Sequence, residues 1–178
     1  MFSGCTSLTL IPTLSAKTLA PSCYEGMFKD CISLTSAPKL QAETLEPSCY
    51  AYMFSGCTSL TEAPELSAAI LTSSCYEGMF QGCESLTEAP QIYATTLADS
   101  CYKKMFQNCI LLKDFVPLST MVLAPSCYAY MFSGCTSLKS YKDVDNLEYN
   151  NRFKNLLQAT TLKSSCYEGM FEGCTGLI

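Results

Sequence analysis

The sequence predicts an α/β repeat protein, a right-handed solenoid of short parallel strands and short helices. The first observation is a Met-Phe pair that returns every 26 residues, and the second is a set of cysteines that keeps the same interval. A period of about 20 to 50 residues is the signature of a solenoid or an array. Each repeat of a solenoid contacts only its neighbours, so we expect like side chains to lie on one another. The Met-Phe pairs stand at 1-2, 27-28, 53-54, 79-80, 105-106, 131-132 and 170-171.

The whole chain, 1–178, is predicted to form a single solenoid domain. The last interval between Met-Phe pairs is 39 residues instead of 26, which places an insertion at 145–158. The chain starts and stops inside a unit, so we expect a fragment of a longer protein or one segment of an assembly. The expected units are about 1–26, 27–52, 53–78, 79–104, 105–130, 131–169 and a partial unit, 170–178.

A short helix is expected in each unit, over the segment that contains the Met-Phe pair. Ser48 stands where a helix N-cap is favoured, and Cys49 and Met53 are spaced to share one helical face. Gly56 follows where a left-handed residue would end such a helix. The helix would have only about two turns, too few to persist without packing.

Two short strands are expected to complete the unit. Leu60 and Leu66 recur with the period, and Pro64, which lacks a main-chain N–H, marks the end or the edge of the first strand. The apolar pair at 70–71 also recurs and is interpreted as a second, shorter strand. Stacked units would then form parallel sheets, with the helix as the crossover between strands.

The unit as a whole reads L-T-x-A-P-x-L, followed by T-L-x-x-S-C-Y-x-x-M-F-x-G-C-x-S-L. This pattern resembles the BspA-like leucine-rich repeats of bacterial surface proteins, and the resemblance covers nearly the whole chain except 145–158. Its most specific part is the Phe-x-x-Cys-x-x-Leu core. The asparagine of ribonuclease-inhibitor-type repeats is absent. The resemblance implies a leucine-rich-repeat solenoid, an extracellular or cell-surface location, and adhesion to host proteins or to other cells.

The thirteen cysteines fall into two columns of the repeat and are predicted to be buried, reduced thiols. A free cysteine packs as a small buried hydrophobe. Within a unit the two cysteines would lie near or beyond the roughly 7 Å Cα separation that a disulfide allows, and a column of seven cannot pair completely. Zinc is disfavoured, because the chain has no C-x-x-C pair and no histidine. The predicted core contains Phe28, Phe54, Phe80, Phe106 and Phe132 with Cys31, Cys57, Cys83, Cys109 and Cys135.

Composition argues against several classes of function. A net charge of −5 with a single arginine disfavours nucleic acid, which clustered basic residues bind. No apolar run approaches the roughly 18 residues of a membrane span. Without histidine, a Cys-His or Ser-His nucleophile cannot be assembled within the chain, and no phosphate-binding or dinucleotide motif is present. We therefore expect no enzymatic activity and no cofactor.

The insertion at 145–158 offers one candidate binding site. It carries Tyr149, Arg152 and Phe153, aromatic and Arg types that are enriched at interface hot spots, and an insertion in a solenoid often lies on the binding face. In the other interpretation, Phe153 and the leucines of the insertion pack a half-unit into the core. Both interpretations predict that the repeat units on either side of the insertion stack normally.

Exposed-looking positions near the first strand offer a second candidate. Glu62 and Glu88 lie one unit apart there, and Tyr93 follows a few residues later. A stripe of carboxylates is able to hold calcium, but a solvated acidic face is commoner, and no metal site is predicted. At the strand spacing of about 5 Å the two carboxylates would also resemble a retaining glycosidase pair. A repeat creates such pairs automatically, so this likeness carries little weight.

We expect a non-enzymatic binding module that recognises protein or glycan partners at a cell surface through the solenoid face. The alternative is a structural role, as a spacer or an assembly component of a larger surface or phage particle. Uncapped apolar ends would favour that alternative, because open edges associate with one another. Self-association through the ends is the interaction that it predicts.

Overall fold

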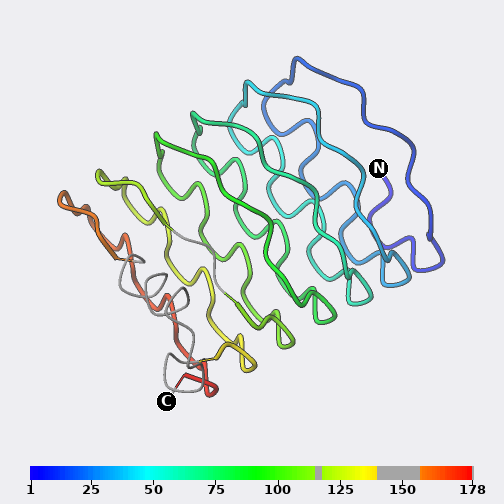
Figure 1. Ribbon diagram of the computed structural model, residues 1–178. Coiled ribbons are helices and arrows are strands. Elements are labelled where there is room, and N and C mark those ends of the chain that lie inside the picture. The colour runs from blue at the N-terminus through cyan, green and yellow to red at the C-terminus, as the bar shows by residue number, and fades with distance from the viewer. Residues whose placement is uncertain (115–117, 140–156, 178) are drawn as a thin grey trace.

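The computed structural model describes residues 1–114, 118–139 and 157–177. Their chain winds into a stack of similar rungs, with the two termini at opposite ends of the stack (Figure 1). We number the rungs from the residue that follows each cysteine of the Phe-x-x-Cys core. Rungs one to six are 6–31, 32–57, 58–83, 84–109, 110–135 and 136–174.

The predicted α/β solenoid of helices and strands is wrong. No helix occurs in the described residues, and β structure there is limited to isolated parallel bridges between neighbouring rungs. The leucine-rich-repeat architecture expected from those elements is overturned with it, although the regular cysteine and aromatic spacing is compatible with a repeat. The bridges join Leu14 to Leu40, Ser36 to Glu62, Leu66 to Ile92, Ile70 to Thr96 and Val122 to Thr161.

Overlapping β-turns replace the predicted helix. In the first rung, every second N–H from Cys23 to Cys31 donates to the carbonyl three residues earlier. Ser22, Gly26 and Asp30 have left-handed φ angles of 56°, 56° and 59°. A type II turn requires such a residue at its third position, whereas a right-handed helix excludes one at every fourth residue. We call this segment the turn ladder, and it spans 20–31, 46–57, 72–83, 98–109, 124–135 and 163–174.

The remaining N–H groups of a turn ladder bond to the next rung. The Tyr24 N–H donates to the Cys49 carbonyl at 3.0 Å, and the Phe28 N–H donates to the Met53 carbonyl at 2.9 Å. Main-chain donors thus alternate between their own rung and its neighbour, whereas a helix would direct all of them along its own axis. This alternation satisfies the buried backbone without helix or sheet.

The segments predicted as strands bury their leucines without forming a sheet. Leu60 and Leu66 are buried in the core. The Thr61 N–H donates to the Thr35 carbonyl of the preceding rung at 2.9 Å, but Pro64 has no N–H with which to continue the pairing. Pairing therefore stops after a single bridge, and the prediction of parallel sheets fails at this point.

Columns of stacked aromatic rings form the centre of the fold. Phenylalanine rings of neighbouring rungs lie with their centroids 5.6 to 5.9 Å apart and their planes within 4° to 11° of parallel. A tyrosine column stacks in the same way. Such offset pairs contribute about 0.5–1.5 kcal/mol each beyond the burial of their area. The fully buried phenylalanines are Phe28, Phe54, Phe80, Phe106 and Phe132.

A column of thiols runs beside the phenylalanines. The Cys57 thiol donates to the Phe28 carbonyl at 3.1 Å, and this carbonyl also accepts the Cys31 N–H at 3.2 Å. Burial raises the pKa of Cys57 to about 12, so the thiol stays protonated and able to donate. All thirteen cysteines lie in the described ranges, and all are free. The fully buried members of this column are Cys31, Cys57, Cys83, Cys109 and Cys135.

Candidate functional site

Two exposed columns run side by side along the stack, immediately before a leucine that recurs in every rung. This leucine is buried at Leu45 and Leu71, which holds the two preceding residues at the surface. We call the two exposed columns the outer face. The first column holds Lys17, Glu43, Ala69, Thr95, Met121 and Thr160, and the second holds Thr18, Thr44, Ile70, Thr96, Val122 and Thr161.

The outer face changes from rung to rung, whereas the core columns repeat. Its first column alternates among basic, acidic, small, hydroxyl-bearing and apolar side chains. Its second column is threonine except at Ile70 and Val122, which are 66% and 61% exposed. Single exposed apolar residues are normal on a surface, but here they replace threonine at fixed positions of a repeat. Successive rungs thus present different pairs of side chains.

Threonine pairs close the outer face between some rungs. Between the third and fourth rungs, the Ala69 carbonyl accepts the N–H groups of Thr95 and Thr96 at 2.9 and 3.2 Å and the Thr95 hydroxyl at 3.3 Å. The Thr96 carbonyl accepts the Leu71 N–H at 3.0 Å. Thr160 and Thr161 of the sixth rung bond to the Met121 carbonyl of the fifth in the same way. We call this arrangement a closed step.

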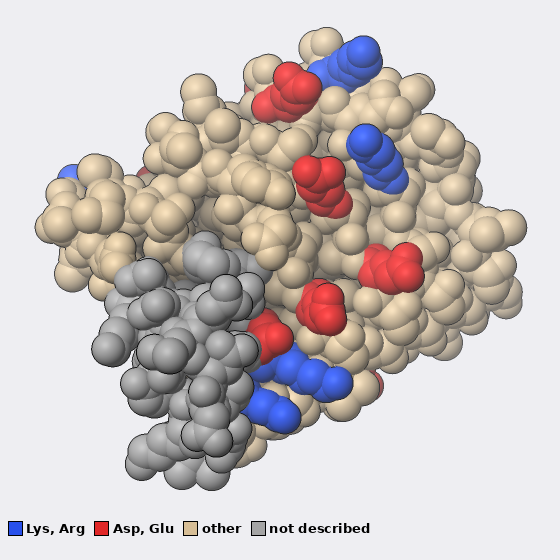
Figure 2. Space-filling view, viewed as in Figure 1, with Lys and Arg blue, Asp and Glu red and all other residues tan. Residues whose placement is uncertain are grey.

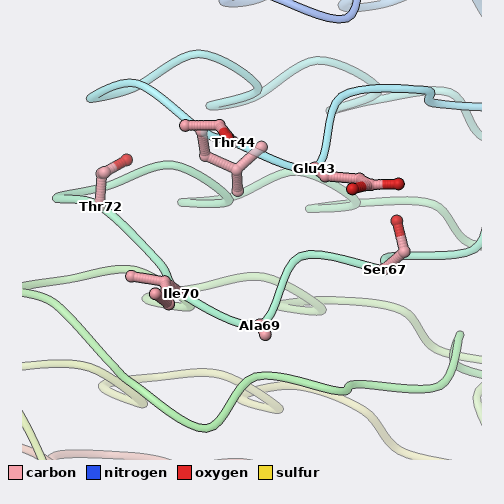
Figure 3. A pocket seen from close by; sticks show the side chains of 7 residues that line it. Glu43, Thr44, Ser67, Ala69, Ile70 and Thr72 are labelled. Atoms are coloured by element: carbon pink, nitrogen blue, oxygen red, sulfur yellow. The ribbon is translucent and has the colours of Figure 1, made fainter.

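The step between the second and third rungs is open. Ala69 and Ile70 occupy the places that Thr95 and Thr96 hold one rung later, and no main-chain hydrogen bond joins 43–45 to 69–71, all of them described residues. A groove of about 500 Å³ lies between the two segments (Figure 3). We call it the open groove, and it is lined by Glu43, Thr44, Leu45, Ser67, Ala69, Ile70 and Thr72.

Charged side chains surround this region. A second groove of about 480 Å³ shares Glu43 and Ser67 with the open groove, and Lys17, Lys39 and Glu65 also line it. Figure 2 shows carboxylates crossing this side of the molecule between basic side chains at either end. The open groove itself has one charged side chain in its lining, Glu43. The rest of its lining combines apolar side chains (Leu45, Ala69 and Ile70) with hydroxyl groups (Thr44, Ser67 and Thr72), and binding grooves also combine apolar surface with a few polar groups.

The structure places two of the predicted binding residues together. Glu62 and Glu88 are exposed and line one shallow groove of about 220 Å³ with Thr61, Ala63, Ala89 and Pro90. Tyr93 is 53% exposed and lines none of these three grooves. Tyr149, Arg152 and Phe153 lie outside the described residues. The acidic pair is thus brought to one surface, and the tyrosine is not part of it.

Sequence reasoning missed the open groove. Ile70 belongs to the predicted shorter strand, and Glu43, Thr44 and Ala69 are not among the predicted binding residues. The available signal was the loss of the Thr-Thr pair: the fourth and sixth rungs have it, and the third has Ala69-Ile70 instead. The sequence does not reveal the effect of this replacement, because the Thr95 hydroxyl bonds to the Ala69 carbonyl on a different rung.

Polar contacts near the Met-Phe segments join neighbouring rungs. The Tyr52 hydroxyl donates to Glu77 at 2.8 Å, and burial together with this bond raises the pKa of Tyr52 to about 12. The Tyr130 hydroxyl donates to Glu168 at 2.7 Å, and this bond lowers the pKa of the Glu168 carboxyl. Lys103 lies 3.9 Å from Glu77. These contacts stabilise the stack.

Within the described ranges, no three His, Cys, Asp or Glu side chains gather where they could bind a metal ion. No helix in those ranges is of the kind that crosses a membrane. No protein-family model, curated protein or solved structure matches this chain, so its function is inferred from its own residues.

Proposed function

We propose that this chain is a non-enzymatic recognition module that binds a protein or glycan partner through its outer face. One observation carries the proposal: the core repeats from rung to rung, but the exposed columns beside the buried leucines do not. A spacer needs only the repeating interior. Distinct groups on successive rungs give each stretch of the face its own shape and charge, which discrimination between partners requires.

A place at the cell surface forms part of the proposal, and the burial of the cysteines is compatible with it. The reactive form of a cysteine is its thiolate, and burial raises the pKa of Cys49 to about 11 and of Cys75 to about 12. Eleven of the thirteen thiols are buried. Such a core would oxidise slowly even in a compartment that favours disulfides.

The test uses two substitutions of the same kind at exposed isoleucines. Binders are first selected against the immobilised chain from a random peptide-display library and from a glycan array. Ile70→Asp should weaken those binders about tenfold or more, the effect of losing a central interface residue. Ile110→Asp is the control, because Ile110 is also exposed but lines none of the three grooves.

Two results would contradict the proposal. One is a set of binders that responds equally to both substitutions. The other is the absence of any binder together with light scattering that rises steeply with protein concentration, which would favour the structural alternative of an assembly component.

A further inference from the structure

The open step leaves main-chain groups without partners. Thr96 bonds to the carbonyl of Ala69 and to the N–H of Leu71, which lie on either side of Ile70. In an extended segment, successive residues direct their main-chain groups to opposite sides. The N–H and carbonyl of Ile70 therefore point away from the fourth rung, toward Glu43 and Leu45.

These groups make no hydrogen bond among the described residues. The Ile70 N–H and carbonyl, the Leu45 N–H and the Glu43 carbonyl are all unpaired, although their counterparts at the closed step, on Ala69, Leu71 and Thr96, are bonded. The groove therefore offers two donors and two acceptors within a few residues. A main-chain segment of another polypeptide presents the same alternation of donors and acceptors, as in strand-addition recognition.

The side chains that line the open groove restrict which side chains a bound peptide can carry. Leu45, Ala69 and Ile70 give it an apolar floor and wall, and Figure 3 shows Thr44 and Ile70 on its two facing edges. Glu43 stands at one side as the charged group of the lining. An apolar side chain beside a basic one would match this lining, and the net charge of −5 also favours a cationic partner.

We propose that the open groove binds an extended peptide segment of a partner protein, with an apolar side chain over Ala69 and Ile70 and a neighbouring basic side chain beside Glu43. The inference rests on the proposed recognition function and specifies its partner. A step is closed to this segment where the later of its two rungs carries a Thr-Thr pair, because the hydroxyl and N–H groups of that pair occupy the carbonyl of the earlier rung.

The structure supplies the substitution that should remove the site. Ala69→Thr combined with Ile70→Thr recreates in the third rung the pair that closes the fourth. The new Thr hydroxyl and N–H groups should bond to the Glu43 carbonyl and close the groove. Ile110→Thr is the matched control, an exposed isoleucine changed in the same way outside the groove.

The probe is a fluorescently labelled, end-capped hexapeptide of alternating valine and lysine, and binding is followed by fluorescence anisotropy. The double threonine variant should bind it about tenfold more weakly than the wild type, because two or three main-chain bonds are lost. The control variant should change the affinity by less than about twofold. Methylating alternate peptide nitrogens should weaken binding to the wild type by a similar factor of about ten.

A charge exchange at an exposed position tests the inference without altering the backbone. Glu43→Lys should weaken the valine-lysine peptide and favour a valine-glutamate peptide instead. Unchanged affinity in the double threonine variant, or indifference of the wild type to peptide methylation, overturns the inference. So does a glycan ligand that the double threonine variant no longer binds, since the groove would then take a sugar. The valine-lysine peptide could fail to bind the wild type while the selected binders are still weakened by Ile70→Asp. That result overturns this inference but leaves the proposed recognition function standing.

Discussion

The ring of Tyr52 fills the space that a side chain at Gly78 would need. A Cβ built at Gly78 would overlap the ring edge of Tyr52 on the preceding rung, and Tyr130 covers Gly169 in the same way. Tyr52 also donates to Glu77, the neighbour of Gly78. An Ala-Tyr unit is thus matched with a Glu-Gly unit on the next rung. The repeat therefore contains pairs of complementary units, in which a large side chain faces a glycine.

Gly78→Ala should destabilise the protein much more than Gly26→Ala. Both glycines have a φ of 56°, so each substitution costs about 1–2 kcal/mol for a left-handed alanine. Only Gly78 lies under a tyrosine, whereas the nearest atom to a Cβ at Gly26 is the Lys29 Cβ at 3.9 Å. We expect an additional loss of about 1–3 kcal/mol at Gly78 from overpacking, measured by urea unfolding.

The same pair allows a coupling measurement. In a Tyr52→Ala background, Gly78→Ala should cost no more than Gly26→Ala, because the ring that it would displace is absent. Equal costs for the two alanine substitutions in the wild type would show that Tyr52 moves aside freely.

Thiol reactivity should divide the thirteen cysteines into two groups. Cys5 and Cys23 are exposed, and the other eleven are buried and free. We expect two thiols to react rapidly with Ellman's reagent in the native protein, and the remaining eleven to react only as the protein unfolds. Mass spectrometry after a short pulse of iodoacetamide should identify the two. Rapid labelling of Cys57 or Cys83 would contradict the buried thiol column.

Stability should fall as the pH rises above about 9. Burial raises the pKa of Cys57 from 9.0 to about 12 and that of Cys127 to about 11, so the native state holds protons that the unfolded chain releases. The stabilising contribution of each thiol is complete below pH 9 and is lost as the pH rises toward the native pKa. The loss approaches about 1.4 kcal/mol per pH unit for each such thiol.

Urea unfolding under reducing conditions at several values between pH 7 and pH 10.5 would measure this slope. The Cys57→Ser variant should show a shallower slope, by about one proton, since its hydroxyl does not titrate in this range. A free energy of unfolding that stays constant from pH 8 to pH 10 would contradict the raised thiol pKa values.

Hydrogen exchange should distinguish the open step from the closed one. Leu45 and Leu71 occupy the same column and are 3% and 4% exposed. The Leu71 N–H is bonded to Thr96, whereas the Leu45 N–H has no partner in the structure. We expect the Leu71 amide to exchange at least about tenfold more slowly than the Leu45 amide. Equal protection of the two amides would mean that the second step is closed in solution.

The predicted helix failed for a physical reason that is visible in single residues. Cys49 and Met53 are spaced i,i+4, which suits a helix, but Ser48 and Tyr52 both have a left-handed φ of 55°. The clue in the sequence was glycine at intervals of four, as at Gly78 and Gly82. Serine and tyrosine at equivalent positions concealed it, because neither is expected in that conformation. Contacts between rungs must hold them there.

The open groove was equally beyond prediction, and for a related reason. Ala69-Ile70 and Thr95-Thr96 occupy the same place in the repeat. Whether such a pair closes a step depends on a bond from Thr95 to a carbonyl 26 residues away, on another rung. A pattern within one unit contains no information about that distance.

The 26-residue period was enough to assign residues to columns and to set the interior phenylalanines and cysteines apart from the variable surface, because a constant period brings like residues to like places. It could not say how the main chain satisfies its hydrogen bonds. Turns that alternate with bonds to the next rung serve that need as well as helices do, and they form only when a neighbouring rung supplies the acceptors. The path of the backbone, and the groove that it leaves between Glu43 and Ile70, were therefore decided by contacts between rungs.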